Sequence, residues 1–275
     1  MAGLKKNYSF TSKRNIWRLI PSESGYLVIE ERDMSSREVF FNCLNLNDGK
    51  VLFKNFQLEE KHWIGIESVH NNLIFFHKFR KPDMPGHKGI YAFDILNRKM
   101  IWQNDDLLFL FAKDDKVYVY QSTFEGRQYY VLDSHTGNII EEMGSEFSQI
   151  SKLREEVMRS DFTNTFLYPQ PFNDNLESGD VPKSMKGLLS EMKVVGKIKW
   201  LVLKDLILFN YHEQNSNGTF NNYFKVFDLL KQKYILNETL NLKAKNLVPE
   251  SFFVVEDLIF LLVEKTKLVV YRIMQ

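Results

Sequence analysis

The sequence predicts an all-β fold in which a four-stranded antiparallel sheet repeats along the chain, and three observations predict it. A hydrophobic strand that ends in Asp or Asn and continues into a turn and a second strand occurs in four copies, one of them at 130–140. A polar pair followed by an apolar strand, which is a hairpin signal, occurs upstream of these turns. Aromatic residues make up 14% of the chain, and such side chains pack well on pleated sheets.

Both markers indicate the same repeat length. The polar pair recurs at 24–25, 71–72, 114–115, 204–205 and 256–257, and the residue that ends the strand recurs at Asn45, Asp94, Asp133 and Asp228. Either series indicates a unit of about 40 to 50 residues, which is the period of four-stranded propeller blades. Each unit is expected to hold strand a before the polar pair, strand b after it, strand c up to the Asp or Asn, and strand d after the turn.

The units follow one another along the chain as five blades. Blade one covers 16–56, with strands at 17–20, 26–30, 38–44 and 51–56, and blades two, three and four cover 64–103, 108–143 and 198–237. Blade five begins near Phe252 and ends with its third strand at 267–273, so the N-terminal segment 7–12 is expected to supply a fourth. The expected fold is a five-bladed β-propeller of four-stranded antiparallel blades, closed by an N-terminal strand, in a single domain over residues 1–275.

The interval 146–196 interrupts the repeat and contains neither marker. Ile150, Leu153 and Val157 have helical spacing, which predicts a short amphipathic helix, and Met185 to Met192 predict another. Prolines and polar turn formers between them, at 168–175, argue against a regular element there. We interpret the interval as a partly helical insertion between blades three and four, with a degenerate sixth blade as the alternative.

The turn after strand c resembles the repeat of quinoprotein-type (PQQ-like, WD-like) β-propellers, in which an Asp ends the strand, Thr-Gly makes the turn and strand d carries Trp. The matching residues are Asp133, Thr136, Gly137, Asp94 and Trp102. The resemblance covers blades one to four loosely, and it departs from the pattern at Phe53, Glu141, Leu236, Arg98 and Gln232. It implies the fold and not quinone-dependent dehydrogenase activity, whose pocket nothing here supplies. The chain also resembles an uncharacterised bacterial family of compact propeller-like proteins.

Composition narrows the classes of function. Lys and Arg number 36 against 35 Asp and Glu, so no overall positive field is available to hold a nucleic acid. Cys43 is the only cysteine, which excludes an intramolecular disulfide and a cysteine-based metal cluster. No window approaches 18 consecutive apolar residues and the N-terminus shows no secretory signal. We therefore expect a soluble, cytoplasmic monomer with no membrane partner.

Binding residues are expected at one end of the sheets. The b–c connections at 32–37, 80–88, 121–127 and 213–219 are long, and they share that end with the insertion. Loops elaborated on one end of a rigid scaffold commonly hold binding sites. The aromatic and amide residues of the insertion are suited to a sugar or a peptide, although they equally suit a plug at the end of a propeller. The candidate binding residues are Tyr168, Phe172, Asn173, Asp174 and His212.

The sequence contains no GxSxG, Walker A or GxGxxG motif, and its six histidines lack HxH or HExxH spacing. We therefore expect no catalytic residue, metal or cofactor, although separate blades can assemble a metal site that spacing does not reveal. The leading hypothesis is a non-catalytic interaction module that binds a protein or peptide through its loop-rich end. The alternative is a hydrolase, or a propeller that binds a small molecule or carbohydrate, with a site at the channel mouth that includes His212 and Asp174.

Overall fold

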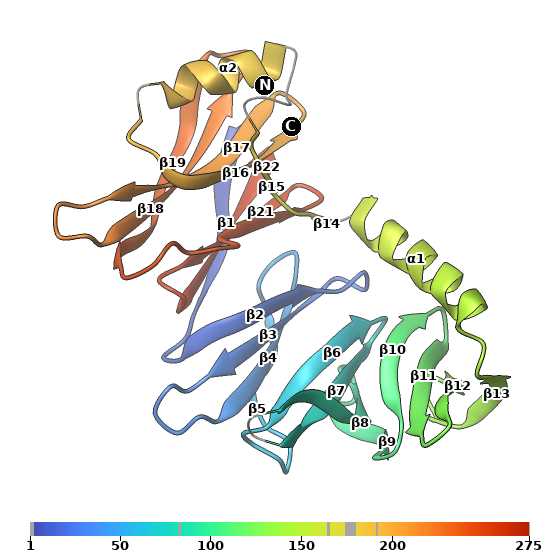
Figure 1. Cartoon of the computed structure of the whole chain (residues 1–275). Helices are drawn as coiled ribbons and strands as arrows, with labels where there is room; N and C mark the ends of the chain where they lie inside the picture. The colour runs from blue at the N-terminus through green and yellow to red at the C-terminus, as the bar shows by residue number, and fades with distance from the viewer. Residues whose placement is uncertain (1–2, 82–83, 164–165, 174–179, 191, 275) are drawn as a thin grey trace. The chain divides into compact units, whose positions relative to one another are not determined.

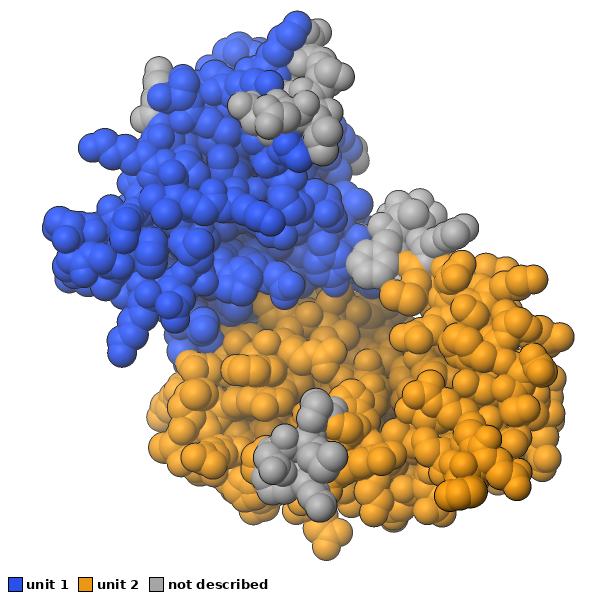
Figure 2. Space-filling model, viewed as in Figure 1, with its two compact units in different colours: residues 1–12, 166–275 blue, residues 13–165 orange. Residues whose placement is uncertain are grey.

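A computed structural model describes residues 3–81, 84–163, 166–173, 180–190 and 192–274. Antiparallel strands dominate these residues, together with two helices. The chain divides into two compact units, one formed by Met1–Ser12 and Phe166–Gln275 and the other by Lys13–Thr165 (Figure 2). Neither helix of the described residues is long and apolar enough to span a membrane.

The unit Lys13–Thr165 contains three four-stranded antiparallel sheets, each with its strands in sequence order (Figure 1). The first sheet is β2 (Asn15–Pro21), β3 (Tyr26–Arg32), β4 (Val39–Asn45) and β5 (Val51–Phe56). The second is β6 (Ile64–His70), β7 (Leu73–Lys81), β8 (Met84–Asp94) and β9 (Lys99–Asn104). The third is β10 (Leu108–Lys113), β11 (Lys116–Thr123), β12 (Gly126–Asp133) and β13 (Ile139–Gly144). The predicted order of strands a to d is confirmed in all three.

The other unit contains two five-stranded antiparallel sheets. One sheet has the order β15 (Gln170–Pro171), β16 (Val195–Leu203), β17 (Leu206–Gln214), β18 (Phe220–Asp228) and β19 (Lys233–Ala244). The other has the order β1 (Gly3–Thr11), β22 (Lys267–Met274), β21 (Leu258–Val263), β20 (Phe252–Val255) and β14 (Phe166–Leu167). The N-terminal strand therefore pairs with the last strand of the chain, from Thr11 opposite Lys267 to Gly3 opposite Met274.

The expectation that 168–175 holds no regular element was wrong at β15. Gln170 and Pro171 pair with Trp200 and Lys199 of β16. Pro171 is tolerated because β15 is an edge strand. The outer side of an edge strand forms no hydrogen bonds to another strand, so a residue without an N–H can face that side. A strand of two residues is too short to leave a periodic pattern in the sequence, so the prolines were the stronger signal and they indicated a loop.

The insertion supplies the two helices, and each covers the face of a sheet within its own unit. Helix α1 (Phe147–Thr163) buries Ile150 against a cluster on sheet β10–β13 that includes Phe111 and Tyr118. Helix α2 (Asp180–Leu189) buries Met185 in a cluster with Trp200 and Phe209 of sheet β15–β19. Both helices contain the predicted apolar spacing, so the partly helical insertion is confirmed in the described residues.

The turn after strand c is stabilised by the side chain that ends the strand. Oδ1 of Asp133 accepts hydrogen bonds from the backbone N–H groups of His135 and Thr136 and from the hydroxyl of Thr136. Asn45, Asp94 and Asp228 accept the corresponding backbone bonds in their own turns. The Thr136 hydroxyl bond, followed by the backbone bonds, lowers the pKa of the Asp133 carboxyl. The repeated motif is therefore structural, as the sequence predicted.

Candidate functional site

The candidate site lies on sheet β6–β9, on the face of β7 that is directed toward sheet β10–β13. Leu73 and Phe75 of β7 belong to one core cluster with Val117 and Val119 of β11. Because side chains alternate along a strand, His77 continues this face toward the end of the sheet where β7 leads to β8. The b–c connections were predicted at that same end, but the long loop expected at 80–88 was wrong, because β7 extends to Lys81 and β8 begins at Met84.

A β-bulge in β6 directs Glu67 onto this face. Ile66 pairs with Phe76 and Ser68 pairs with Phe75, so Glu67 has no partner on β7. A bulge inserts one extra residue into a strand and redirects its side chain, and bulges are common beside functional sites. Two further irregularities lie in the pairing of β7 with β8, on either side of the pair Phe79–His87. They turn His87 toward the same face.

The bulge recurs at the same place in the two neighbouring sheets of the unit. In sheet β2–β5 the extra residue is Trp17, and the guanidinium carbon of Arg32 lies 4.7 Å from the centre of its ring. In sheet β10–β13 the extra residue is Leu110, and Tyr120 takes the place that His77 takes on β7. The bulge is thus repeated, and among its three copies only the one in the second sheet carries a carboxylate and an imidazole, which are side chains of the kinds that can bind a metal ion.

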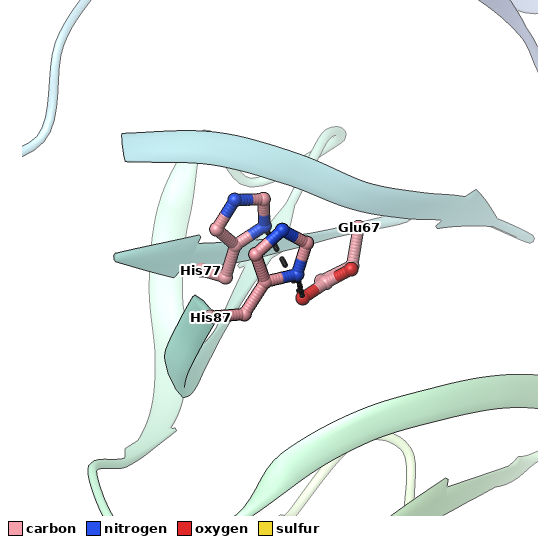
Figure 3. A group of neighbouring side chains, drawn as sticks. All are labelled: Glu67, His77 and His87. Atoms are coloured by element: carbon pink, nitrogen blue, oxygen red, sulfur yellow. Dashed lines mark hydrogen bonds and ion pairs between the residues drawn. The ribbon is translucent and has the colours of Figure 1, made fainter. Parts of the chain in front are cut away.

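Glu67, His77 and His87 converge from three adjacent strands (Figure 3). Nδ1 of His87 lies 2.6 Å from Oε1 of Glu67 and forms a hydrogen bond, while Nδ1 of His77 lies 3.2 Å from the same oxygen. The two imidazole rings are stacked, with centroids 3.6 Å apart and planes 8° from parallel. One carboxylate oxygen therefore faces a ring nitrogen from each histidine.

Burial differs sharply within the cluster. The side chain of His77 is 4% exposed and that of Glu67 13%, whereas that of His87 is 40% exposed. Neither ring nitrogen of His77 has a hydrogen-bond partner among the described residues, so its contact with Glu67 has the distance of an ion pair without hydrogen-bond geometry. A buried polar group without a partner is costly, and each such group calls for an explanation.

The two histidines favour the charged form of Glu67. Burial alone raises the pKa of the Glu67 carboxyl, but the adjacent rings of His77 and His87 outweigh burial and hold that pKa below its usual value. Glu67 is therefore an anion at neutral pH. A partly buried carboxylate beside two imidazole nitrogens is a ligand set that divalent transition metal ions use in proteins.

The donor atoms of the three residues all lie within 4.8 Å of one another. In a tetrahedral zinc site, bonds of about 2.0–2.1 Å place neighbouring ligand atoms about 3.3 Å apart. The 3.2 Å between Glu67 and His77 already matches that spacing, and the 2.6 Å between Glu67 and His87 is shorter because a proton joins the two atoms. Two imidazoles and one carboxylate would leave the fourth position of the ion for water or another small ligand.

The residues predicted from the insertion lie on the other unit. Tyr168 is exposed and stacks on Phe253, with centroids 6.0 Å apart. Phe172 is half-buried and packs edge-on against Trp200 at 5.1 Å. Asn173 is exposed and follows β15. A binding role for these three residues stays a prediction.

His212 is buried in β17, and its Nε2 accepts a hydrogen bond of 3.0 Å from the backbone N–H of Val248. Burial lowers the pKa of His212, so the ring is neutral and serves as an acceptor within the fold. Asp174 lies outside the described residues. Among the described candidates, Tyr168 packs against β20 and Phe172 against β16. A binding role for His212 and Asp174 also stays a prediction.

The sequence analysis missed the cluster of Glu67, His77 and His87. Its histidines are ten residues apart, on strands b and c, and the bulges make their shared face impossible to read from simple alternation. One available signal was the polar character of His77 at a position where strand b is otherwise apolar, from Leu73 to Phe76.

Comparisons with known proteins give one family match and several weak structural likenesses. Residues 20–102, a stretch that includes all three clustered residues, match a family described as a domain of unknown function (DUF4905). No curated protein matches the chain.

The structural likenesses are to larger chains. Hsv2 of Kluyveromyces lactis is 14% identical, with 90% of this chain and 74% of that chain covered and a TM-score of 0.31. A europium-containing methanol dehydrogenase is 14% identical, with 94% and 47% covered and a TM-score of 0.28. A complex of KlAtg21 with the coiled coil of AgAtg16 is 8% identical, with 91% and 67% covered and a TM-score of 0.31.

Proposed function

We propose that this chain is a metal-binding module that holds a divalent first-row transition ion, best fitted by Zn²⁺, through Glu67, His77 and His87. One observation carries the proposal. A buried imidazole without a hydrogen-bond partner among the described residues faces an anionic carboxylate that it shares with a second imidazole. A metal ion would convert the unpartnered nitrogen of His77 into a ligand and offset the cost of burying it.

The ligand set also selects among ions. Imidazole nitrogens suit Zn²⁺, Cu²⁺, Fe²⁺ and Ni²⁺, whereas Ca²⁺ and Mg²⁺ prefer shells made of oxygen. Two nitrogens and one oxygen therefore favour the first group. Zn²⁺ fits best because it accepts four-coordinate sites with three protein ligands and has no geometric preference from its d electrons.

The test is metal binding by the full chain after treatment with a chelator. Titration with Zn²⁺ should show one site per chain, and Co²⁺ should give the visible absorption of a four-coordinate ion. Loss of a residue that only supports a metal ligand weakens metal binding by about 10–100-fold. His77→Ala and Glu67→Gln each remove a ligand and should weaken zinc binding by more than that. His135→Ala, which removes an exposed histidine of the same unit, is the matched control and should change nothing. Equal binding by the wild type and His77→Ala would overturn the proposal.

For the fold, we propose that the five sheets are the blades of one five-bladed β-propeller closed by β1. The support is the meander of strands a to d in three consecutive sheets and the pairing of β1 with β22. A single compact domain of this length should have a radius of gyration of about 19 Å. Small-angle scattering checks this, since two separated units would give a clearly larger value.

We further propose that the module binds a protein or peptide at the end of the sheets where β7 leads to β8. The support is that His87, the most exposed member of the cluster, lies in the β7–β8 hairpin at that end. Pull-downs should be made with Zn²⁺ and with chelator, and with and without residues 146–196. A specific partner that stays bound under every condition would refute both the metal-dependent and the insertion-dependent form of this proposal.

Hydrolysis is the second candidate function, and the open fourth position favours it. An ion held by three protein ligands can bind a water molecule and lower its pKa, as in zinc hydrolases. A panel of ester, peptide and phosphoester substrates, measured with the zinc-loaded chain, tests this candidate. Turnover that persists in His77→Ala would assign the activity to a contaminant or to another site.

A further inference from the structure

We infer that Gly65 and Phe79 are positioning residues that fix His77 as an Nδ1 ligand, and that His87 is the ligand that swings to admit the ion. This inference rests on the proposed metal-binding function. It concerns how the site is built and loaded, and it assigns roles to two residues that hold no metal-binding atom in their side chains.

Gly65 determines which nitrogen of His77 is available. It pairs directly with His77 across β6 and β7. A Cβ at position 65 would lie 2.9 Å from Cε1 and 3.0 Å from Nε2 of His77, closer than real Cβ contacts. The ring therefore packs its Nε2 edge against the backbone of β6 and directs Nδ1 toward Glu67. Only a residue without a side chain leaves room for this orientation.

Phe79 also packs against the ring of His77. Its ring lies edge-on to that of His77, with centroids 4.9 Å apart and planes at 84°, and edge-on to that of His87 at 5.6 Å and 88°. Edge-to-face pairs of this kind are favourable. His77 is thus held by the β6 backbone, by Phe79 and by the stacked ring of His87, so its orientation is fixed before any ion arrives.

The stacked arrangement differs from the arrangement that binds an ion. An ion midway between two parallel rings with centroids 3.6 Å apart would lie about 1.8 Å from each ring plane. A bond of about 2.0–2.1 Å to a ring nitrogen requires the ion to lie close to that plane. The two rings therefore cannot bind one ion while they are stacked, and one of them has to turn.

His87 is the ring that can turn. Its side chain is 40% exposed, whereas His77 is enclosed on the sides described above. Its strand is also irregular on both sides of it, with Gly89 in the left-handed region at φ 69°. Rotation of the His87 ring toward solvent would separate the stack and leave room for an ion held by Glu67, His77 and His87. The fourth position of the ion then faces solvent, where a small anion or water can reach it.

Gly65→Ala in the full chain tests the role of Gly65. The backbone at position 65 does not have a positive φ, so alanine keeps the strand and displaces only the His77 ring. We expect zinc affinity to fall by about 10–100-fold, the usual cost of losing an outer-shell support, and the Co²⁺ spectrum to shift. The matched control is Gly187→Ala, where a Cβ meets nothing within 4 Å and metal binding should be unchanged.

Phe79→Leu provides a second variant that leaves the strand pairing intact. It should weaken zinc binding in the same way without abolishing it. Imidazole signals in ¹H–¹⁵N spectra, recorded with and without Zn²⁺, should show a large change for the His87 ring and coordination through Nδ1 for His77.

The outcomes separate the two proposals. If the wild-type chain binds no zinc, both the proposed function and this inference are overturned. If the wild type binds zinc but Gly65→Ala and Phe79→Leu bind it equally with the same Co²⁺ spectrum, only the inference is overturned. Coordination of His77 through Nε2 would also overturn the inference while the proposed function stands.

Discussion

Substituting alanine for Gly137 and glycine for Arg98 changes the same turn position in two neighbouring sheets, and we expect opposite effects on stability. Each residue lies four positions after the Asp that ends strand c. Both have left-handed backbone conformations, with φ of 71° at Gly137 and 54° at Arg98. The left-handed region is unfavourable for residues with a Cβ.

The structure allows both magnitudes to be worked out. Alanine at 137 would cost about 1–2 kcal/mol for the positive φ. Its Cβ would also lie 2.6 Å from Cδ2 of Trp102, and displacing that indole breaks the 2.8 Å hydrogen bond from Nε1 to the carbonyl of Ser134. That bond adds about 0.5–1.5 kcal/mol, so the total loss is about 1.5–3.5 kcal/mol. Glycine at 98 relieves the backbone cost but adds freedom to the unfolded chain, for a net gain of about 0.5–1 kcal/mol.

Urea unfolding followed by tryptophan fluorescence measures both changes, because Trp102 of β9 packs against the turn at Gly137. The midpoint should fall for Gly137→Ala and rise for Arg98→Gly, with the slope unchanged in both variants. A loss below 1 kcal/mol for Gly137→Ala, or a stability change of the same sign in both variants, would refute the idea that the left-handed backbone at this turn position determines the effect.

Three further predictions concern buried groups. Burial lowers the pKa of His212, so its stabilising contribution is fully present above the unfolded pKa of about 6.5 and is lost as pH falls through the folded pKa. Unfolding free energies measured over a series of pH values should show this fall in the wild type, and the fall should be smaller in His212→Gln. Burial raises the pKa of Cys43 to about 12, so a thiol reagent should label the native chain far more slowly than the urea-unfolded chain. Asn222 donates to Asn241 and Ser251 and accepts from Asn210, so Asn222→Ala should destabilise by about 1–3 kcal/mol in the same unfolding assay, whereas an unchanged midpoint would contradict that network.

The strands and turns were predictable because their causes are local. A polar pair supports a two-residue turn through its left-handed residue, as at Asn71 and Asp114, where φ is 51° and 53°. An Asp that ends a strand binds backbone N–H groups two and three positions later, as at Asp133. The helix α1 followed equally from the spacing of its apolar residues. Each signal lies within a few residues of the structure that it predicts.

The short edge strands and the candidate site were not predictable, because their causes are distant in sequence. The pairing of Gln170 with Trp200 joins residues that share no periodic pattern. The histidine cluster depends on three register irregularities, and a slip of one residue moves a side chain to the opposite face of a sheet. His77 and His87 meet only because the irregularities in β8 fall where they do.

The repeated bulge explains why a site of this kind can arise on this fold. The first strand of each sheet in the unit Lys13–Thr165 carries an extra residue at the same place, and the neighbouring strand carries a side chain within reach of it. With Trp17 as the extra residue, the neighbour is Arg32 and the contact is a cation–π pair. With Glu67, the neighbour is His77, and the contact places a carboxylate beside an imidazole. A change of side chains at these two positions thus replaces a packing contact by a carboxylate beside an imidazole, and the irregular pairing of β7 with β8 adds His87 as the third member of the cluster.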